Sequence, residues 1–243
     1  MTVFAHKGDR PSARRGGEEF KGTMGKVLGV LGGMGPAATV AFLARVQALT
    51  PAQGDQDHIR IIADINPQVP DRNRAPDAAE KTLGMMALRL RDAGAQVLAM
   101  PCNTAHAQAA GVKKAGLPFI DMIAETTEAA VGGGAKKIGV LATPGGEALY
   151  TRSLQSRGAK IVRLSGAARE GFMACVYAVK RGDVGEAPRT EMRRLAALLV
   201  AAGAEAVIAG CTEVPLLLSA EDVSVPLVDS AEVLAKACVD RCK

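Results

Sequence analysis

Aromatic residues are scarce in this sequence. The 243 residues include two tyrosines, five phenylalanines and no tryptophan, so aromatic platforms on which nucleic-acid bases could stack are poorly supplied. The formal net charge is +5, and residues 1–23 carry +2 of it, with five Lys or Arg against three Asp or Glu. The remaining +3 is spread too thinly to indicate a nucleic-acid partner, whereas a small anionic ligand is compatible with it.

Long hydrophobic runs are also lacking. No stretch approaches the roughly 20 apolar residues of a transmembrane helix, and the first residues are charged and contain no apolar segment of the kind that a secretory signal has. The five cysteines are an odd number without the dense spacing of a disulfide framework, which favours a reducing compartment. We therefore expect a cytoplasmic protein with free thiols and with neither a nucleic-acid nor a membrane partner.

The chain divides into a leader and a globular part. Residues 1–23 combine low hydrophobicity with clustered Gly, Ser and Arg, which predicts a disordered leader. From Gly25 onward, short apolar runs such as KVLGVLGG and IRIIADI alternate with Ala-rich and Leu-rich stretches of helical periodicity. Strands that alternate with helices indicate an α/β fold with a mostly parallel sheet.

The globular part contains an internal repeat of three matched segments. They are KVLGVL at 26–31 with KIGVL at 137–141, AGAQVLAMPCNT at 93–104 with AGAEAVIAGCTE at 202–213, and LPFID at 117–121 with VPLVD at 225–229. Because the three matches keep one order and nearly one shift, they indicate a duplication.

The duplication predicts two pseudo-symmetric α/β lobes, each with a mostly parallel sheet flanked by helices, and an active site in the cleft between them. We assign residues 24–123 plus 224–243 to the first lobe and residues 124–223 to the second. In this division the last helix packs back on the first lobe.

Two cysteines occupy equivalent positions in the repeat. Cys102 and Cys211 each follow a buried strand and precede a polar pair, and ligands of open α/β sheets bind at such strand ends. A helix N-terminus after each cysteine predicts a lowered thiol pKa. A small buried hydrophobic residue is the alternative role, and it is the one expected for Cys175, Cys238 and Cys242, which lack this context.

Two thiols that face each other across a cleft suit racemisation. One thiolate removes a proton from one face of a carbon, and the opposite thiol delivers a proton to the other face. Such a reaction needs no cofactor, but it needs fixed donors for the developing negative charge and the exclusion of water.

Five short motifs follow one another along the chain: GVLGGMGPAAT at 29–39, DQDH at 55–58, NPQVPDR at 66–72, MPCNTAH at 100–106 and GCTEVPLL at 210–217. Together they resemble the aspartate/glutamate racemase family, in its aspartate racemase branch, from about Gly25 to the C-terminus. The resemblance implies two pseudo-symmetric lobes, no pyridoxal phosphate, no metal and a homodimer. It also implies that Cys102 and Cys211 are the acid and base, and that Arg72 and Lys180 hold the carboxylates of a small acidic amino acid.

Other residues near the motifs could contact a substrate. A guanidinium at Arg72 could clamp a carboxylate in a bidentate pair, with a solvated loop arginine as the alternative. Thr104, Thr143 and Asn103 follow strands and are candidates for which helix capping is the alternative role. Glu213 is a further candidate, with an acid at a helix N-terminus as the alternative. Asn66 and Thr212 complete these candidates.

The glycine-rich turn and one histidine complete the candidates. GVLGGMG lacks the G-x-G-x-x-G spacing of dinucleotide sites, so we expect the turn, with Gly33 and Met34, to approach a substrate carboxylate through its backbone. His106 lies four residues after Cys102 and could serve it as a base, with a packing role as the alternative. Two other functions stay open: another paired-cysteine isomerase, acting on maleate or a hydantoin, and a non-catalytic binder of small carboxylates.

Overall fold

The computed structural model describes residues 25–243; the predicted leader, residues 1–23, lies outside the described residues. The elements of the first half are β1 (Leu28–Gly32), α1 (Pro36–Leu49), β2 (Ile61–Ile65), α2 (Pro76–Asp92), β3 (Val97–Ala99), α3 (Ala109–Lys113), β4 (Phe119–Ile120) and α4 (Met122–Gly132). Those of the second half are β5 (Lys137–Leu141), α5 (Pro144–Ser156), β6 (Lys160–Val162), α6 (Gly166–Lys180), α7 (Glu186–Ala201), β7 (Ala206–Ala209), β8 (Leu227–Asp229) and α8 (Ser230–Cys242).

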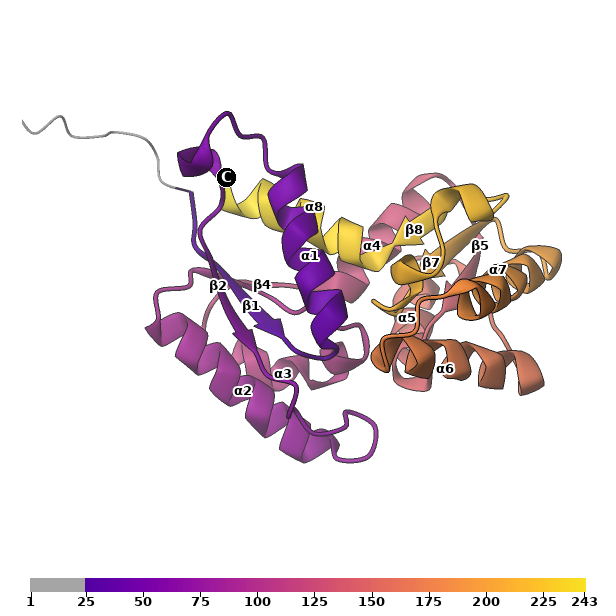
Figure 1. The fold of residues 1–243 in the computed structure, drawn as a ribbon, viewed down its shortest axis with the longest axis horizontal. Coiled ribbons are helices and arrows are strands. Elements are labelled where there is room, and N and C mark those ends of the chain that lie inside the picture. Colours follow the sequence, from indigo (N-terminus) through magenta and orange to yellow (C-terminus); the bar gives the residue numbers. More distant parts are fainter. Residues whose placement is uncertain (1–24) are drawn as a thin grey trace, which may run out of the picture.

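The strands form two four-stranded parallel sheets with the same topology. One sheet has the order β2-β1-β3-β4 and the other the order β6-β5-β7-β8, and Figure 1 shows them in two separate halves of the molecule, each with its own helices. The predicted α/β fold and the duplication are confirmed.

The central strand of each sheet carries a glycine where a helix packs closely. A β-carbon at Gly29 in β1 would lie 3.5 Å from Leu90 Cβ in α2, and one at Gly139 in β5 would lie 3.1 Å from Leu199 Cβ in α7. Gly29 and Gly139 are equivalent in the repeat, so the matched glycines of the sequence serve the same close packing in both halves.

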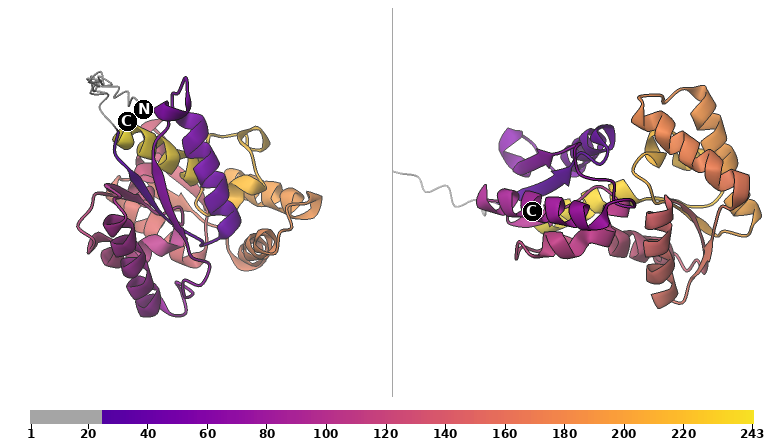
Figure 2. Two further views of the ribbon diagram at one scale, coloured as in Figure 1. Left: turned by 60° about the vertical axis from the view of Figure 1, so that its left-hand side comes forward. Right: turned by 90° about the horizontal axis from the view of Figure 1, so that it is seen from below.

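The helix that follows the last strand of each sheet packs against the other half of the molecule. Helix α4 follows the first sheet but packs into the core beside β5 and α5, while α8 follows the second sheet and packs against α1 and β1. Both views in Figure 2 show α8 returning to the half that contains α1. Asp121 and Asp229, also equivalent in the repeat, cap the two crossing helices by accepting backbone N–H groups.

One predicted boundary is corrected by the strand pairing. The division at residue 224 places β8 in the first lobe, but β8 pairs with β7 in the second sheet, because its backbone completes that ladder. Only α8, after Asp229, lies against the first sheet. Among the described residues, none of the helices is long and apolar enough to cross a membrane.

Candidate active site

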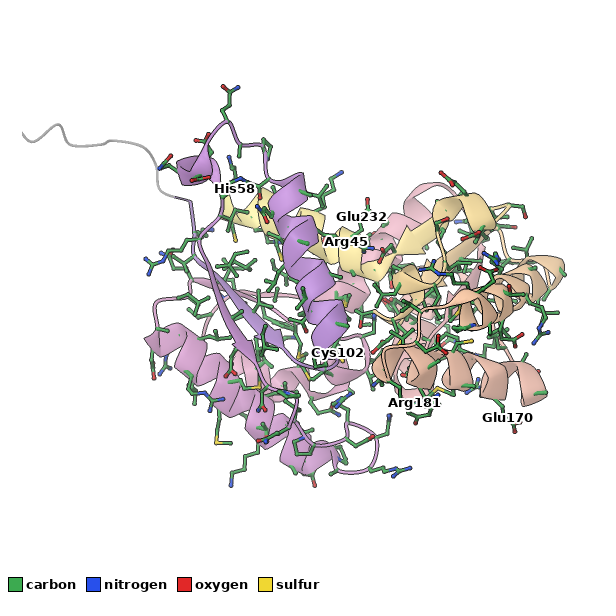
Figure 3. The ribbon with its side chains drawn as sticks, in the orientation of Figure 1. Arg45, His58, Cys102, Glu170, Arg181 and Glu232 are labelled. Carbon is green, nitrogen blue, oxygen red and sulfur yellow. The ribbon has the colours of Figure 1, made fainter. Side chains whose placement is uncertain are left out.

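Cys102 and Cys211 lie at the carboxyl ends of β3 and β7, the equivalent strands of the two sheets. Both side chains are buried, with 5% and 7% exposure, and both line one cavity of about 60 Å³. Figure 3 shows Cys102 close to the junction of the two halves. The structure thus brings the two matched cysteines into a common site.

Most of the other candidates line the same cavity; they are Met34, Arg72, Asn103, Thr104, Thr143, Lys180, Thr212 and Glu213. Gly33 lies instead on an adjoining cavity of about 390 Å³, which shares Met34, Arg72, Lys180 and Glu213 with the first. Asn66 is not among the residues that line either cavity.

The surroundings of Cys102 are cationic. Burial and, to a smaller extent, the Glu213 carboxylate raise the pKa of its thiol above the ordinary value, while the Arg72 guanidinium, the Ala105 backbone N–H and the Lys180 ammonium act against that rise. A nearby positive charge favours the thiolate over the thiol. Cys102 is therefore the cysteine of this site whose ionisation is assisted.

The surroundings of Cys211 are anionic. Its thiol donates a hydrogen bond to Oε2 of Glu213 over 2.9 Å, and burial together with the Glu213 carboxylate raises the pKa of this thiol well above its ordinary value. A carboxylate beside a sulfur disfavours the thiolate and holds the proton on it. The pKa of Cys211 is accordingly raised further than that of Cys102, so Cys211 ionises less readily.

The predicted lowering of both thiol pKa values is wrong. The residues after Cys102 and Cys211 form short 3-10 helices, Thr104–Gln108 and Val214–Leu216, which align few peptide dipoles. Removal of the sulfurs from water outweighs the backbone N–H groups of Ala105 and Glu213 that act on the two thiols.

Arg72 and Lys180 bring the positive charge to the cavity from opposite halves. Arg72 Nη1 donates only a long bond of 3.4 Å to the Pro70 carbonyl, and its Nε is buried without a partner. Lys180 Nζ, at the end of α6, lies 3.9 Å from Oε1 of Glu213. The Arg72 guanidinium is therefore free to take an anionic ligand, whereas Lys180 faces a carboxylate.

Thr104 and Thr143 join the two halves at the cavity. Their hydroxyl oxygens are 2.7 Å apart, and Thr143 also caps α5 by accepting the Gly146 N–H. Capping, the alternative role for Thr143, is therefore present, and both threonines still line the cavity.

The glycine-rich turn does not offer the amide of Gly33 to a ligand. The Gly33 N–H donates to Thr39 Oγ1 over 2.9 Å, so the expectation that this amide approaches a carboxylate is wrong. Gly33 has a φ of 96°, and a β-carbon there would lie 2.4 Å from the Asn66 backbone. Asn66 accepts the Gln68 N–H through its own side-chain oxygen, which fixes the adjoining loop rather than a substrate.

His106 supports the Cys102 loop and is not placed as a base for its thiol. Its Nε2 accepts the N–H of Met122, the first residue of α4. Its Nδ1 therefore carries the proton and donates to the Cys102 carbonyl over 2.9 Å. Burial lowers the pKa of His106, which keeps the imidazole neutral.

Three residues of α6 line the cavity but were not among the candidates predicted from the sequence. Met173, Val176 and Tyr177 line the cavity together with Lys180, and their spacing of three, four and seven residues places all four on one helical face. From this spacing relative to Lys180, the three residues could have been predicted to lie beside it. Asp71 and Asn73, which flank Arg72, also line the cavity.

Comparison with known proteins places this geometry in a family. Residues 31–238 match the profile of the family described as Asp/Glu/hydantoin racemase. The chain belongs to this family. The predicted family, and with it the assignment to a family of isomerases, is confirmed.

Relatives with described names agree with that placement. The broad specificity amino-acid racemase RacX of Bacillus subtilis is 27% identical over 228 residues, covering 88% of this chain and 96% of RacX. The structure of Picrophilus torridus aspartate racemase superposes with a TM-score of 0.76 and 28% identity, covering 89% of this chain and 94% of that one. Glutamate racemase from Francisella tularensis shares the fold, with a TM-score of 0.67, 18% identity and coverage of 89% and 80%.

Proposed function

We propose that the protein racemises an acidic amino acid, with aspartate as the first candidate, by a two-base mechanism that uses Cys102 and Cys211 and no cofactor. The observation that carries this proposal is the pair of buried cysteines, at equivalent strand ends of the two sheets, that line one cavity together with Arg72. Family membership supports the reaction class.

The two thiols supply both proton transfers. In one direction, the Cys102 thiolate removes the Cα proton of the substrate and becomes a thiol, and the Cys211 S–H then delivers its proton to the opposite face of the carbanion. Cys211 is left as a thiolate, so the reverse direction begins from the opposite state and protons balance over the two directions. The cationic surroundings of Cys102 favour the first state.

Charged neighbours position the substrate and the protons in this proposal. Arg72, with its unpartnered Nε, receives a substrate carboxylate and stabilises the charge that develops there during proton removal. Glu213 accepts the Cys211 S–H and orients it. Lys180 serves the second carboxylate when it leaves Glu213, from which it is separated by 3.9 Å.

A second candidate within this function is racemisation of amino acids with longer side chains. The inner cavity has a volume of about 60 Å³. The adjoining cavity of about 390 Å³ shares four of its lining residues. A side chain longer than that of aspartate could extend into this outer cavity, and the broad specificity printed in the name of RacX fits that possibility.

The deciding experiment is incubation of the purified protein with L-aspartate, L-glutamate and L-α-aminoadipate separately, without added cofactor, followed by chiral chromatography. We expect D-aspartate from the first incubation, and product from the other two if the outer cavity receives the longer side chains. Product from none of the three would overturn the proposal and favour a paired-cysteine isomerase of maleate or hydantoin type, or a carboxylate-binding protein. The homodimer and the cytoplasmic location stay predictions.

A further inference from the structure

Tyr150 of α5 lies between the residues that neighbour the two cysteines. Its ring is fully buried, and its hydroxyl donates to Oδ1 of Asn103 over 2.6 Å. On the other side, a β-carbon at Gly210 would lie 2.8 Å from Cε2 of the ring. Asn103 follows Cys102 and Gly210 precedes Cys211, so one aromatic side chain touches both cysteine loops.

A second path of hydrogen bonds joins the same two loops. Nδ2 of Asn103 donates to the Ser230 hydroxyl over 3.0 Å, and that hydroxyl donates to the carbonyl of Ala209 over 2.7 Å. Ala209 ends β7 and lies two residues before Cys211. With Tyr150, this path makes two connections from the Cys102 loop to the Cys211 loop, and both start from the side chain of Asn103.

The network is rigid because its members are buried and their polar groups are paired. Asn103 is 2% exposed and Ser230 is fully buried, so a shift of one loop against the other would leave a polar group without a partner. Burial also raises the pKa of Tyr150, which keeps its hydroxyl protonated as a donor.

The network of Tyr150, Asn103 and Ser230 is not repeated at the equivalent positions of the duplication. Ser230 follows the matched Asp229, and its counterpart after Asp121 is Met122. Met122 contacts His106 through its backbone N–H. Because the equivalent residue is methionine and has no hydroxyl, the hydrogen bonds made by Ser230 have no counterpart there.

We propose that Tyr150, the side chain of Asn103 and Ser230 are positioning residues that set the separation of the two thiols. This inference rests on the two-thiol racemisation proposed above. Inversion requires one sulfur to take a proton and the other to deliver one, so both must be placed on opposite sides of a single carbon. Exchange of the Cα proton with solvent, with configuration retained, requires only one sulfur.

The separation of the thiols can therefore be read from the ratio of inversion to exchange. We would measure, in heavy water, chiral inversion and deuterium incorporation into the remaining starting enantiomer for the wild type, Tyr150→Phe and Ser230→Ala. Thr50→Val is the matched control, since the Thr50 hydroxyl is also buried and bonds only to its own helix. We expect inversion to fall about tenfold to a hundredfold relative to exchange in the first two variants, and the ratio to stay unchanged in the control.

An unchanged ratio in both Tyr150→Phe and Ser230→Ala would overturn the inference, whether or not the absolute rates fall, because a general loss of stability lowers both rates together. If Tyr150→Phe does not fold, Ser230→Ala decides the question alone. A wild-type protein that neither inverts nor exchanges any substrate contradicts the proposed function instead, so the two failures are distinguishable.

Discussion

The two cysteine loops share a backbone plan but differ in charge. Both follow equivalent parallel strands. Cys102 has Arg72 and Lys180 acting to favour its thiolate against burial and the Glu213 carboxylate, whereas Cys211 donates directly to Glu213, which disfavours its thiolate more strongly. Thr104 stands in the first loop at the position that Glu213 holds in the second. The two loops thus keep the same backbone arrangement, whereas the charged side chains that act most strongly on the two thiols differ in sign.

This difference assigns unequal roles to a symmetric pair. Of the two singly ionised states, the one with the thiolate at Cys102 is favoured because opposite charge stabilises an anion and like charge destabilises it. We therefore expect the two directions of the reaction to respond differently to changes at the two loops.

The largest effect is expected from removal of either sulfur. Cys102→Ala and Cys211→Ala should each lower racemisation by about 10³-fold, since one proton donor or acceptor is missing. Each variant should retain slow deuterium exchange of one enantiomer in heavy water, and the enantiomer should differ between the two variants. Racemisation near the wild-type rate in either variant would contradict the two-thiol mechanism, and exchange of both enantiomers by one variant would indicate a single mobile base.

A smaller effect is expected at Arg72. Arg72→Lys keeps the positive charge near Cys102 but removes the planar fork that can hold a carboxylate through two bonds. We expect kcat/KM to fall about tenfold to a hundredfold, because both the binding of the carboxylate and the stabilisation of its developing charge weaken. Arg74→Lys, in the exposed part of the same loop, is the control and should behave like the wild type. Wild-type kinetics in Arg72→Lys would show that the guanidinium does not clamp the substrate.

The pH dependence of the single-cysteine variants sharpens the comparison directly. Exchange needs a thiolate, and burial raises the pKa of both thiols, so both rates should rise with pH in the alkaline range. The rise for Cys211→Ala, which retains Cys102, should occur at lower pH than the rise for Cys102→Ala, because the pKa of Cys211 is raised further. The measurement is kcat/KM for deuterium exchange against pH, and coincident profiles would contradict the assignment of unequal charge.

The smallest change is expected when Glu213 is neutralised. In the Cys102→Ala background, Glu213→Gln removes the negative charge beside Cys211, so the pH profile of exchange should move to lower pH, towards that of Cys102. Glu232→Gln, at an exposed position of α8, should leave the profile in place. A profile that moves up in Glu213→Gln would mean that Glu213 assists the ionisation of Cys211.

The repeat made much of this arrangement predictable. The matched segments around Gly29 and Gly139 predicted two similar sheets, and both glycines lie on central strands against a helix. The matched cysteines predicted a shared site, because the carboxyl ends of parallel strands face one edge of a sheet. The boundary before β8 was placed wrongly because strand pairing depends on the neighbouring ladder and not on the segment itself.

The amino-acid sequence by itself determined the alternation of strands and helices, the duplication and the identity of the paired cysteines, because these depend on periodicity and on order along the chain. The tertiary structure alone decided the pKa direction of the thiols, the use of the Gly33 amide by Thr39 and the contact of Tyr150 with both loops. These features depend on burial, on charges from distant parts of the chain and on hydrogen bonds such as that between Tyr150 and Asn103, 47 positions apart. The packing of the folded chain sets them, so they cannot be predicted from a local sequence pattern.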